Sequence, residues 1–357
     1  MLLSELTAST SRLALVGLAK NTGKTEALAA VLRELDDAGR TVGVTSVGRD
    51  GEERDVIDVR IEKPRVTIPA GGLVATTDQL LSASGLPHEL LERTAMRTPL
   101  GRVVVARCRR AGWIEVAGPS AAADVRAVTD AMLAHGAEQV LIDGAIDRRA
   151  ASSPQVSDGL VMSTGAVLSD DIDETVARTL DAVELVRLPR PADGDLPVPA
   201  STMLDAEGAV LLGDDGRRIA LAPRFALTSD AEHTGAALDE NPDVRWLAVG
   251  GAVPDLFLRG LLEAARRRRR ELTVLVADST RVFLADRGPG WYARQGIHLT
   301  VARPIDLRAL TVNPVAPHSH RFDSDELRRR LSDAIGDVPV FDVLDPAYRA
   351  AATAAAR

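Results

Sequence analysis

Short apolar runs alternate with segments of helical spacing along the first part of the chain. Residues 12–17 (RLALVG) and 41–48 (TVGVTSVG) are runs of the kind that form buried strands, and each ends in glycine. Between them, apolar residues recur every three or four positions from Thr25, and Gly39 closes the segment, which predicts a helix. Strand, loop, helix and strand in this order predict a doubly wound α/β fold with a mostly parallel sheet and right-handed crossovers.

The stretch from Arg65 to Val116 interrupts this rhythm. It contains short strand-like runs with Gly and Pro turns around a segment, 78–95, for which we expect a helix. The strands either continue the sheet or form a β-rich elaboration beside it. Beyond this stretch the pattern predicts a helix at about 121–135, strands at 139–145 and 158–166, and a helix at 171–186.

A segment rich in proline and small polar residues, RLPRPADGDLPVPAS, predicts a domain boundary near residues 188–200. Beyond it, a hairpin, a strand–helix–strand pattern between residues 246 and 278, and strands in HLTVAR, ALTVNPV and PVFDVL indicate a second, smaller α/β domain. We therefore expect a first domain at 1–190, a linker at 191–200 and a C-terminal domain at 201–357. The alanine-rich end is expected to fray.

The first candidate for chemistry is the glycine-bounded segment GLAKNTGKT, residues 17–25. A strand that ends in glycine, a loop, and Gly-Lys-Thr at the start of a helix form a phosphate-binding arrangement, the P-loop, because backbone N–H groups and the helix N-terminus converge on the phosphate oxygens. Lys24 would reach the β- and γ-phosphates, and the Thr25 hydroxyl would bind Mg²⁺. The other expected nucleotide contacts are Gly17, Lys20, Asn21, Thr22, Gly23 and Glu26.

Composition strengthens this interpretation. Of the 43 basic residues, only Lys20, Lys24 and Lys63 are lysine, and two of the three lie in this loop. Where a side chain merely needs to be positive, the chain uses arginine. A lysine that persists therefore indicates a place where a compact ammonium group is needed instead of a planar guanidinium.

The loop is one residue longer than the standard pattern, since five residues separate Gly17 from Gly23. It resembles the loop of dethiobiotin synthetase-type P-loop proteins, in the branch that contains metallochaperone and ParA/MinD-like ATPases. Lys20 is similar to the second lysine of that branch, which there lies five positions before the main lysine, whereas the gap here is four. Whether Lys20 reaches a nucleotide across a homodimer interface stays open.

An acidic residue at the end of a neighbouring strand would complete a magnesium site. The segment VLIDG supplies Asp143 after an apolar run, which is the Walker B pattern. Asp50, after the strand TVGVTSVG, is a further candidate for orienting water or metal. Asp147 and Arg148 are either switch residues near the γ-phosphate or an ordinary ion pair.

The loop STGA at 163–166 lies where nucleotide switches often contact the base. The guanine signature Asn-Lys-x-Asp is absent, because none of the asparagines, Asn21, Asn241 and Asn313, is followed by lysine. This favours ATP over GTP as the nucleotide.

Several weaker features have ordinary interpretations. His318 and His320 fit a surface loop better than a metal site. The run 266–270 is typical of a positively charged helix C-terminus. Trp291 and Tyr292 suit either partner contact or packing within the second domain.

The chain carries a net charge of −8, which argues against broad binding of nucleic acid or anionic membranes. Its single cysteine, Cys108, excludes an internal disulfide framework and fits a reducing cytosol. No targeting segment and no membrane-length apolar run is apparent, so we expect a cytoplasmic protein.

Taken in order, GLAKNTGKT, TSVGRDGE, TPLGRVVVAR, EVAGPS, LIDGAIDR and STGA, with ADSTRVFLA, TVNP and PVFDV later, resemble the P-loop subunit of the lysine 5,6-aminomutase reactivase family. The resemblance runs from about residue 12 to about residue 343 and so covers both predicted domains.

The resemblance implies an activity. The aminomutase works with adenosylcobalamin and pyridoxal phosphate, and side reactions leave damaged cobalamin in it, which a reactivase releases with ATP. The P-loop subunit is expected to act beside a MutS-like ATPase subunit. Carried over by position, Gly17, Gly23, Lys24 and Thr25 would bind phosphate and Mg²⁺, and Asp143 would complete the metal shell.

Two alternatives remain. One is a biosynthetic enzyme of the dethiobiotin or cobyrinate synthetase type, which uses ATP to activate a carboxylate. The other is a nucleotide-binding accessory module for metal or molybdenum cofactor assembly, against which the single cysteine and scattered histidines speak.

Overall fold

The computed structural model describes residues 1–48, 66–145, 149–204, 208–221, 231–268, 270–317 and 319–355. The chain divides into two compact units. Unit 1 comprises Met1–Thr179 and Asp306–Arg357, and unit 2 comprises Leu180–Ile305. Unit 2 is therefore an insertion in the sequence of unit 1.

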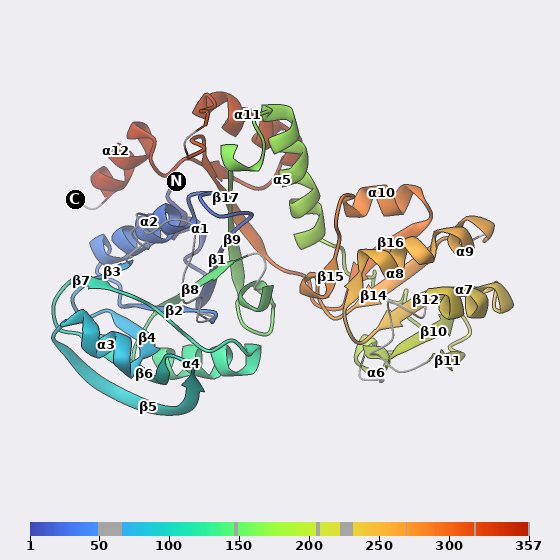
Figure 1. Cartoon of the computed structure of the whole chain (residues 1–357), viewed down its shortest axis with the longest axis horizontal. Helices are drawn as coiled ribbons and strands as arrows, with labels where there is room; N and C mark the ends of the chain where they lie inside the picture. Colours follow the sequence, from blue (N-terminus) through green and yellow to red (C-terminus); the bar gives the residue numbers. More distant parts are fainter. Residues whose placement is uncertain are drawn as a thin grey trace. The chain divides into compact units, whose positions relative to one another are not determined.

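A nine-stranded sheet forms the centre of unit 1. Its strands are β1 Arg12–Gly17, β2 Val42–Ser46, β4 Leu73–Thr77, β5 His88–Thr98, β6 Gly101–Cys108, β8 Gln139–Ala145, β9 Gly159–Gly165, β17 Leu307–Asn313 and β18 Val340–Phe341. They are ordered β18-β17-β9-β1-β8-β2-β4-β6-β5. The strands from β18 to β4 run parallel, and the β6–β5 hairpin adds an antiparallel edge (Figure 1).

The helices of unit 1 are α1 Leu3–Leu6, α2 Lys24–Asp37, α3 Asp78–Ser84, α4 Ala122–Ala134, α11 Ser324–Ile335 and α12 Pro346–Ala355, and α5 Ile172–Val186 contains the boundary with unit 2. Helix α2 buries the apolar face that its spacing predicted, with Leu28, Val31 and Leu35 in the same core as Leu13 and Leu15 of β1. Unit 1 thus has an α/β fold with a large, mostly parallel sheet, which is compatible with a Rossmann or P-loop-like architecture.

The stretch from Arg65 to Val116 both continues the main sheet and forms a β-rich element beside it, which are the two alternatives that its pattern left open. Strands β4, β6 and β5 extend the main sheet, whereas β3 Val66–Ile68 and β7 Gly112–Ile114 form a separate antiparallel ribbon. The predicted helix at 78–95 is wrong beyond Ser84. Gly85 ends α3 in the left-handed conformation (φ +66°), and Pro87 disfavours helical backbone before it. The residues that follow pair with β6 as a long edge strand.

Unit 2 contains a five-stranded sheet in the order β11-β10-β12-β14-β16. Its strands are β10 Ala209–Gly213, β11 Arg218–Ala220, β12 Val244–Val249, β14 Leu272–Val276 and β16 Ile297–Val301, and its helices are α6 Ala200–Leu204, α7 Ala231–Glu240, α8 Asp255–Gly260, α9 Leu262–Arg267 and α10 Pro289–Arg294. The β10–β11 hairpin and the parallel β12–β14 pair confirm two predicted patterns. The strands β13 Val253–Pro254 and β15 Val282–Phe283 pair separately.

The domain division differs from the sequence-based one at two places. Residues 306–357, expected in the C-terminal domain, belong to unit 1, because β17 pairs with β9 and β18 pairs with β17. The segment expected to be a linker, 191–200, lies within unit 2, where Leu196 and Val198 pack against a buried cluster that includes Leu212 and Trp246.

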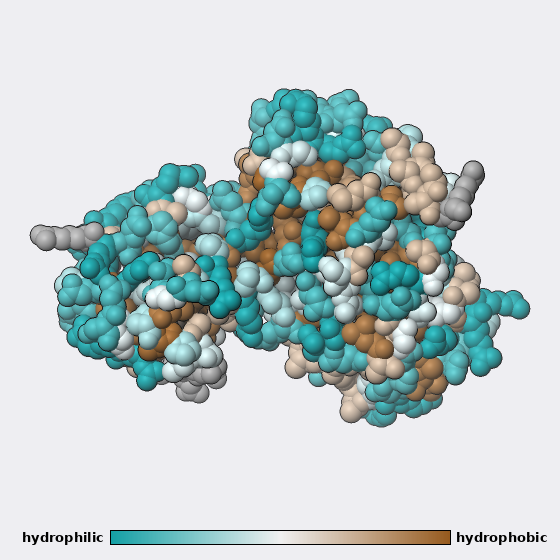
Figure 2. Space-filling view, turned by 180° about the vertical axis from the view of Figure 1, so that it is seen from behind, coloured by the Kyte–Doolittle hydropathy of each residue, from teal (hydrophilic) through white to brown (hydrophobic). Residues whose placement is uncertain are grey.

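The C-terminal residues up to Ala355 form helix α12 instead of a frayed end. Within the described parts of the chain, none of the helices combines the length and the apolar character that a membrane crossing requires. Hydrophilic residues cover most of the face shown in Figure 2, and apolar residues show between them in patches.

Candidate functional site

The loop from Gly17 to Thr25, here called the 17–25 loop, connects β1 to α2 in the middle of the unit 1 sheet. Strand β1 lies between β9 and β8, and all three run parallel. The Leu18 N–H donates to the carbonyl oxygen of Ser163 on β9 (2.9 Å), which holds the start of the loop. The loop therefore lies at the carboxyl edge of the sheet, where open α/β sheets bind ligands.

The two glycines that bound the loop are required by close approach. A Cβ atom at Gly17 would lie 2.5 Å from the Thr22 hydroxyl oxygen, which donates to the Ala19 carbonyl (3.0 Å). Gly23 precedes α2 with φ +84°, and its carbonyl accepts from Ala27 N (3.0 Å). The glycines thus allow a tight loop that leads directly into the N-terminus of α2.

Asn21 is the single non-glycine residue with positive φ (+66°) among the described residues. Asparagine tolerates this left-handed conformation better than most residues. The loop thus has left-handed backbone at both Asn21 and Gly23, and such conformations between right-handed ones can turn successive N–H groups toward one point.

Lys24 and Asp143 form an ion pair across the β1–α2 junction. Their side chains are 22% and 28% exposed, so the pair is partly shielded but open to a ligand. Asp143 lies on β8 with Leu15 of β1 on one side and Ser46 of β2 on the other. The structure thus brings together the lysine and the carboxylate that the sequence predicted for one site.

The remaining predicted site residues have varied positions. Thr25 lies in the first turn of α2 and is partly buried, whereas Lys20, Asn21 and Glu26 are exposed. Asp50, Lys63, Asp147, Arg148 and His318 lie outside the described residues.

The turn that follows β7 packs against the end of β2, beside Asp143. The Ser46 hydroxyl donates to the Val116 carbonyl (3.1 Å) and accepts from Gly118 N (3.0 Å). A Cβ atom at Gly118 would lie 2.0 Å from the Ser46 carbonyl oxygen. The Gly118 position therefore serves backbone packing at the edge of the candidate site.

Sequence reasoning missed the role of Asn313 as a neighbour of the 17–25 loop. Asn313 ends β17, and its side-chain Nδ2 donates to the carbonyl oxygen of Asn21 (2.7 Å). The strand-like run ALTVNPV, in which Asn-Pro follows the apolar residues, was the available signal. It could not identify the contact because the two asparagines are 292 positions apart.

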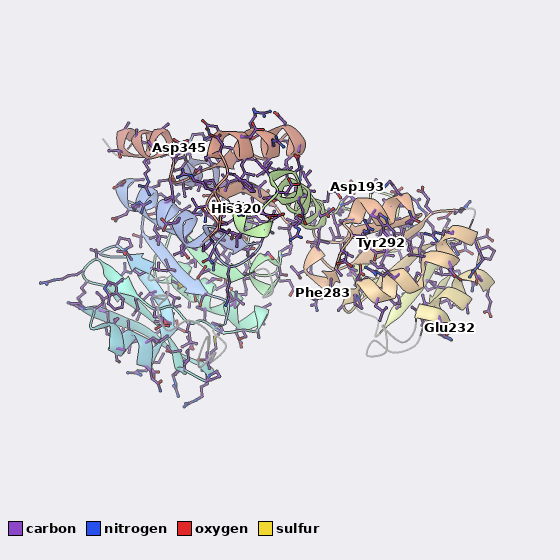
Figure 3. The ribbon with its side chains drawn as sticks, turned by 45° about the horizontal axis from the view of Figure 1, so that its top comes forward. Asp193, Glu232, Phe283, Tyr292, His320 and Asp345 are labelled. Carbon is purple, nitrogen blue, oxygen red and sulfur yellow. The ribbon has the colours of Figure 1, made fainter. Side chains whose placement is uncertain are left out.

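A cavity of about 550 Å³ opens next to Asn313. Its walls combine apolar groups with carboxylates, and they include Pro314, Phe322, Asp325, Asp342 and Asp345. Asp345 lies just before α12 (Figure 3). Asp342 is buried and accepts from the Ser324 hydroxyl (2.6 Å). The cavity therefore offers hydrogen-bond acceptors beside apolar surface.

The weaker sequence features have structural explanations. Tyr292 is buried in unit 2 and donates to Asp255 Oδ1 (2.6 Å), with Trp291 packed edge-on to it, so this aromatic pair belongs to the packing of unit 2 (Figure 3). Arg266 and Arg267 lie in the last turn of α9, as the helix-end interpretation predicted, and Arg267 also pairs with Asp239 (2.7 Å).

Two possible reactive groups are also accounted for. Cys108 is buried in β6, and burial raises the pKa of its thiol, which disfavours a reactive thiolate. His320 packs against Phe322 with 4.9 Å between the rings. Among the described residues, no group of three or more His, Cys, Asp and Glu side chains is arranged to hold a metal ion.

Comparison of the chain with protein-family models, with curated proteins and with solved structures found no match. The residues and the geometry of the 17–25 loop are therefore the grounds on which a function can be assigned.

Proposed function

We propose that the chain binds ATP and Mg²⁺ at the 17–25 loop and acts as the ATP-hydrolysing subunit of a reactivase for an adenosylcobalamin-dependent aminomutase. The observation that carries the nucleotide site is the Lys24–Asp143 pair at the junction of β1 and α2. A lysine on the first helical residue and a carboxylate on the adjacent parallel strand are what phosphate and magnesium binding need.

The charges of this pair match those of Mg·ATP. Lys24 is compensated by Asp143 in the structure. Phosphate oxygens are the natural partners of the ammonium group, and carboxylate and hydroxyl oxygens are the ligands that Mg²⁺ prefers. Asp143 and the Thr25 hydroxyl would hold the metal, while Lys24 and the N-terminus of α2 would face the phosphates. The bound metal would neutralise charge that develops on the transferred phosphoryl group.

The cavity beside Asn313 supports a nucleoside subsite. It lies at the carboxyl ends of β17 and β18, on the same edge of the sheet as the 17–25 loop. Its carboxylates could accept hydrogen bonds from ribose hydroxyls or from the amino group of adenine, and its apolar groups could contact the base.

The order of the motifs along the sequence, which resembles the reactivase family, supports the second part of the proposal, the role in a reactivase. A nucleotide can change the state of a partner only if the ATP and ADP forms bind that partner differently. In this proposal the MutS-like subunit and the aminomutase are the partners, and unit 2 is the candidate surface for contacting them. The loops near the γ-phosphate would report the state of the nucleotide.

Calorimetric titration with Mg·ATP tests the nucleotide site. Lys24→Ala should weaken ATP binding by at least about tenfold, because a charge-assisted contact to phosphate is lost. Arg33→Ala is the matched control, since it removes a cation from the exposed face of the same helix and should leave the affinity unchanged. Undiminished ATP affinity in folded Lys24→Ala protein would refute the site.

A hydrolysis assay separates the reactivase from the carboxylate-activating enzyme. We expect ATP hydrolysis to rise with an aminomutase that carries inactivated cobalamin, and to stay constant with small carboxylic acids. The opposite result would favour the biosynthetic enzyme. If hydrolysis responds to neither, the reactivase proposal fails even where ATP binding is intact.

A further inference from the structure

Asn313 contacts the 17–25 loop at two points. Its Nδ2 donates to the carbonyl of Asn21, the loop residue in the left-handed conformation (2.7 Å). Its Cβ lies so near Gly23 that a Cβ atom added there would be 3.2 Å away. One side chain from β17 therefore contacts both residues of the loop that have left-handed backbone.

The orientation of the Asn313 amide is fixed from its other end. Its Oδ1 accepts a hydrogen bond from the N–H of Val315 (3.1 Å), which leaves Nδ2 for the Asn21 carbonyl. Gly165, at the end of β9, permits this arrangement, because a Cβ atom there would lie 2.1 Å from the Asn313 carbonyl oxygen. The STGA segment thus accommodates the end of β17.

The neighbouring residue Thr311 makes a contact of a different kind. Its hydroxyl bonds to the Ser163 hydroxyl on β9 (2.7 Å) in a buried position. This link reaches the side chain of Ser163, whereas the main-chain carbonyl of the same residue accepts from Leu18 N of the 17–25 loop (2.9 Å). Asn313 and Thr311 are therefore neighbours on one strand with separable roles.

We infer that Asn313 is a positioning residue that holds the phosphate-binding conformation of the 17–25 loop. Since β17 begins directly after unit 2 in the chain, this contact also ties the loop to the segment that returns from unit 2. The inference rests on the proposed function for its effect on nucleotide binding. Its effect on the loop itself can be measured without nucleotide.

Asn313→Asp is the decisive variant. It keeps an oxygen for the Val315 N–H and hence the local turn, but it removes the donor to the Asn21 carbonyl. In nucleotide-free protein, hydrogen exchange of the loop amides 18–24 should become about fivefold faster, as expected for one lost hydrogen bond. Mg·ATP affinity should fall by a similar factor or more. Asn313→Ala should reproduce both effects without the added charge.

Thr311→Val is the control on the same strand. It should lower the free energy of unfolding of the protein, but hydrogen exchange of the loop amides should stay slower than in Asn313→Asp. Loop exchange and ATP affinity equal to wild type in both Asn313 variants would overturn the inference. If wild-type protein binds no ATP but the Asn313 variants still speed loop exchange, the proposed function fails and the positioning role stands.

Discussion

At the scale of single residues, the sparing use of lysine has a structural counterpart. Lys24 is the first residue of α2 and meets Asp143, whereas Lys20 lies four positions earlier and is exposed. The structure therefore gives Lys24 a carboxylate partner at the start of the helix, and the role of Lys20, which the sequence left open, stays a prediction. A compact ammonium can sit between a carboxylate and a tight loop, and this is the setting in which lysine and arginine are not interchangeable.

The Lys24→Arg variant therefore tests whether the size and shape of the cation matter as well as its charge. The guanidinium keeps the positive charge but is planar and bulkier, so it cannot occupy the position of the ammonium beside Asp143. We expect Mg·ATP affinity to fall by about tenfold or more, with the thermal unfolding transition little changed. Titration calorimetry of the arginine variant beside the alanine variant measures this. Wild-type affinity in the arginine variant would show that charge alone suffices.

The proximity of Lys24 and Asp143 could be expected from local patterns in the sequence, and their roles in binding stay predictions. Lys24 follows from Gly-Lys-Thr at a helix start, and Asp143 follows from an apolar strand that ends in Asp-Gly. Asn313 could not be found this way, because its role depends on β17 lying near the loop in space. Asp50 lies outside the described residues, so its predicted role stays a prediction.

At the scale of elements, two segments differ from what the sequence predicted. Residues 88–98 have helix-favouring composition but form β5, because they pair with β6 from His88 to Thr98, with two irregularities in the register. The alanine-rich end forms α12, which is anchored by Tyr348. The Tyr348 hydroxyl donates to Glu34 of α2 (2.6 Å) and accepts from the N–H of Leu3 (3.1 Å). Tertiary contacts thus override the local preference in β5, whereas in α12 they hold a terminal segment whose alanines already favour a helix.

Tyr348→Phe tests whether this anchor stabilises unit 1. It leaves the buried Glu34 carboxylate and the Leu3 N–H each without one partner, which should lower the free energy of unfolding by about 1–3 kcal/mol. Thr353→Ala is the control on the exposed part of α12 and should change it by less than about 0.5 kcal/mol. Urea unfolding of both variants gives the comparison, and equal midpoints would exclude an anchoring role.

At the scale of the whole molecule, the sequence predicted two α/β bodies but not how the chain passes between them. The composition of RLPRPADGDLPVPAS indicated a boundary, yet the last part of the chain returns to the first sheet. Sheet membership of β17 is decided by its pairing with β9, more than 140 positions earlier, and local periodicity carries no information about that partner. Local periodicity does indicate the type and order of the elements, so the fold class was predictable. The insertion depends on long-range pairing and was not.

Each unit contains one of the two tyrosines, so their ionisation reports on both units. Burial, together with a carboxylate neighbour, raises the pKa of Tyr292 to about 12, and burial raises the pKa of Tyr348 further above its ordinary value. An unfolded chain loses these protons near pH 10. Between pH 10 and 12 the unfolded state therefore binds fewer protons than the folded state, and stability must fall as pH rises.

Alkaline titration followed by tyrosinate absorbance and circular dichroism tests this for each unit. In wild-type protein we expect no tyrosinate signal at pH 10 and a rise that coincides with loss of structure at higher pH. Tyr292→Phe leaves Tyr348 as the reporter of unit 1, and Tyr348→Phe leaves Tyr292 as the reporter of unit 2. Two different midpoints would mean that the units unfold separately. A tyrosinate rise near pH 10 with unchanged circular dichroism would contradict the burial of these side chains.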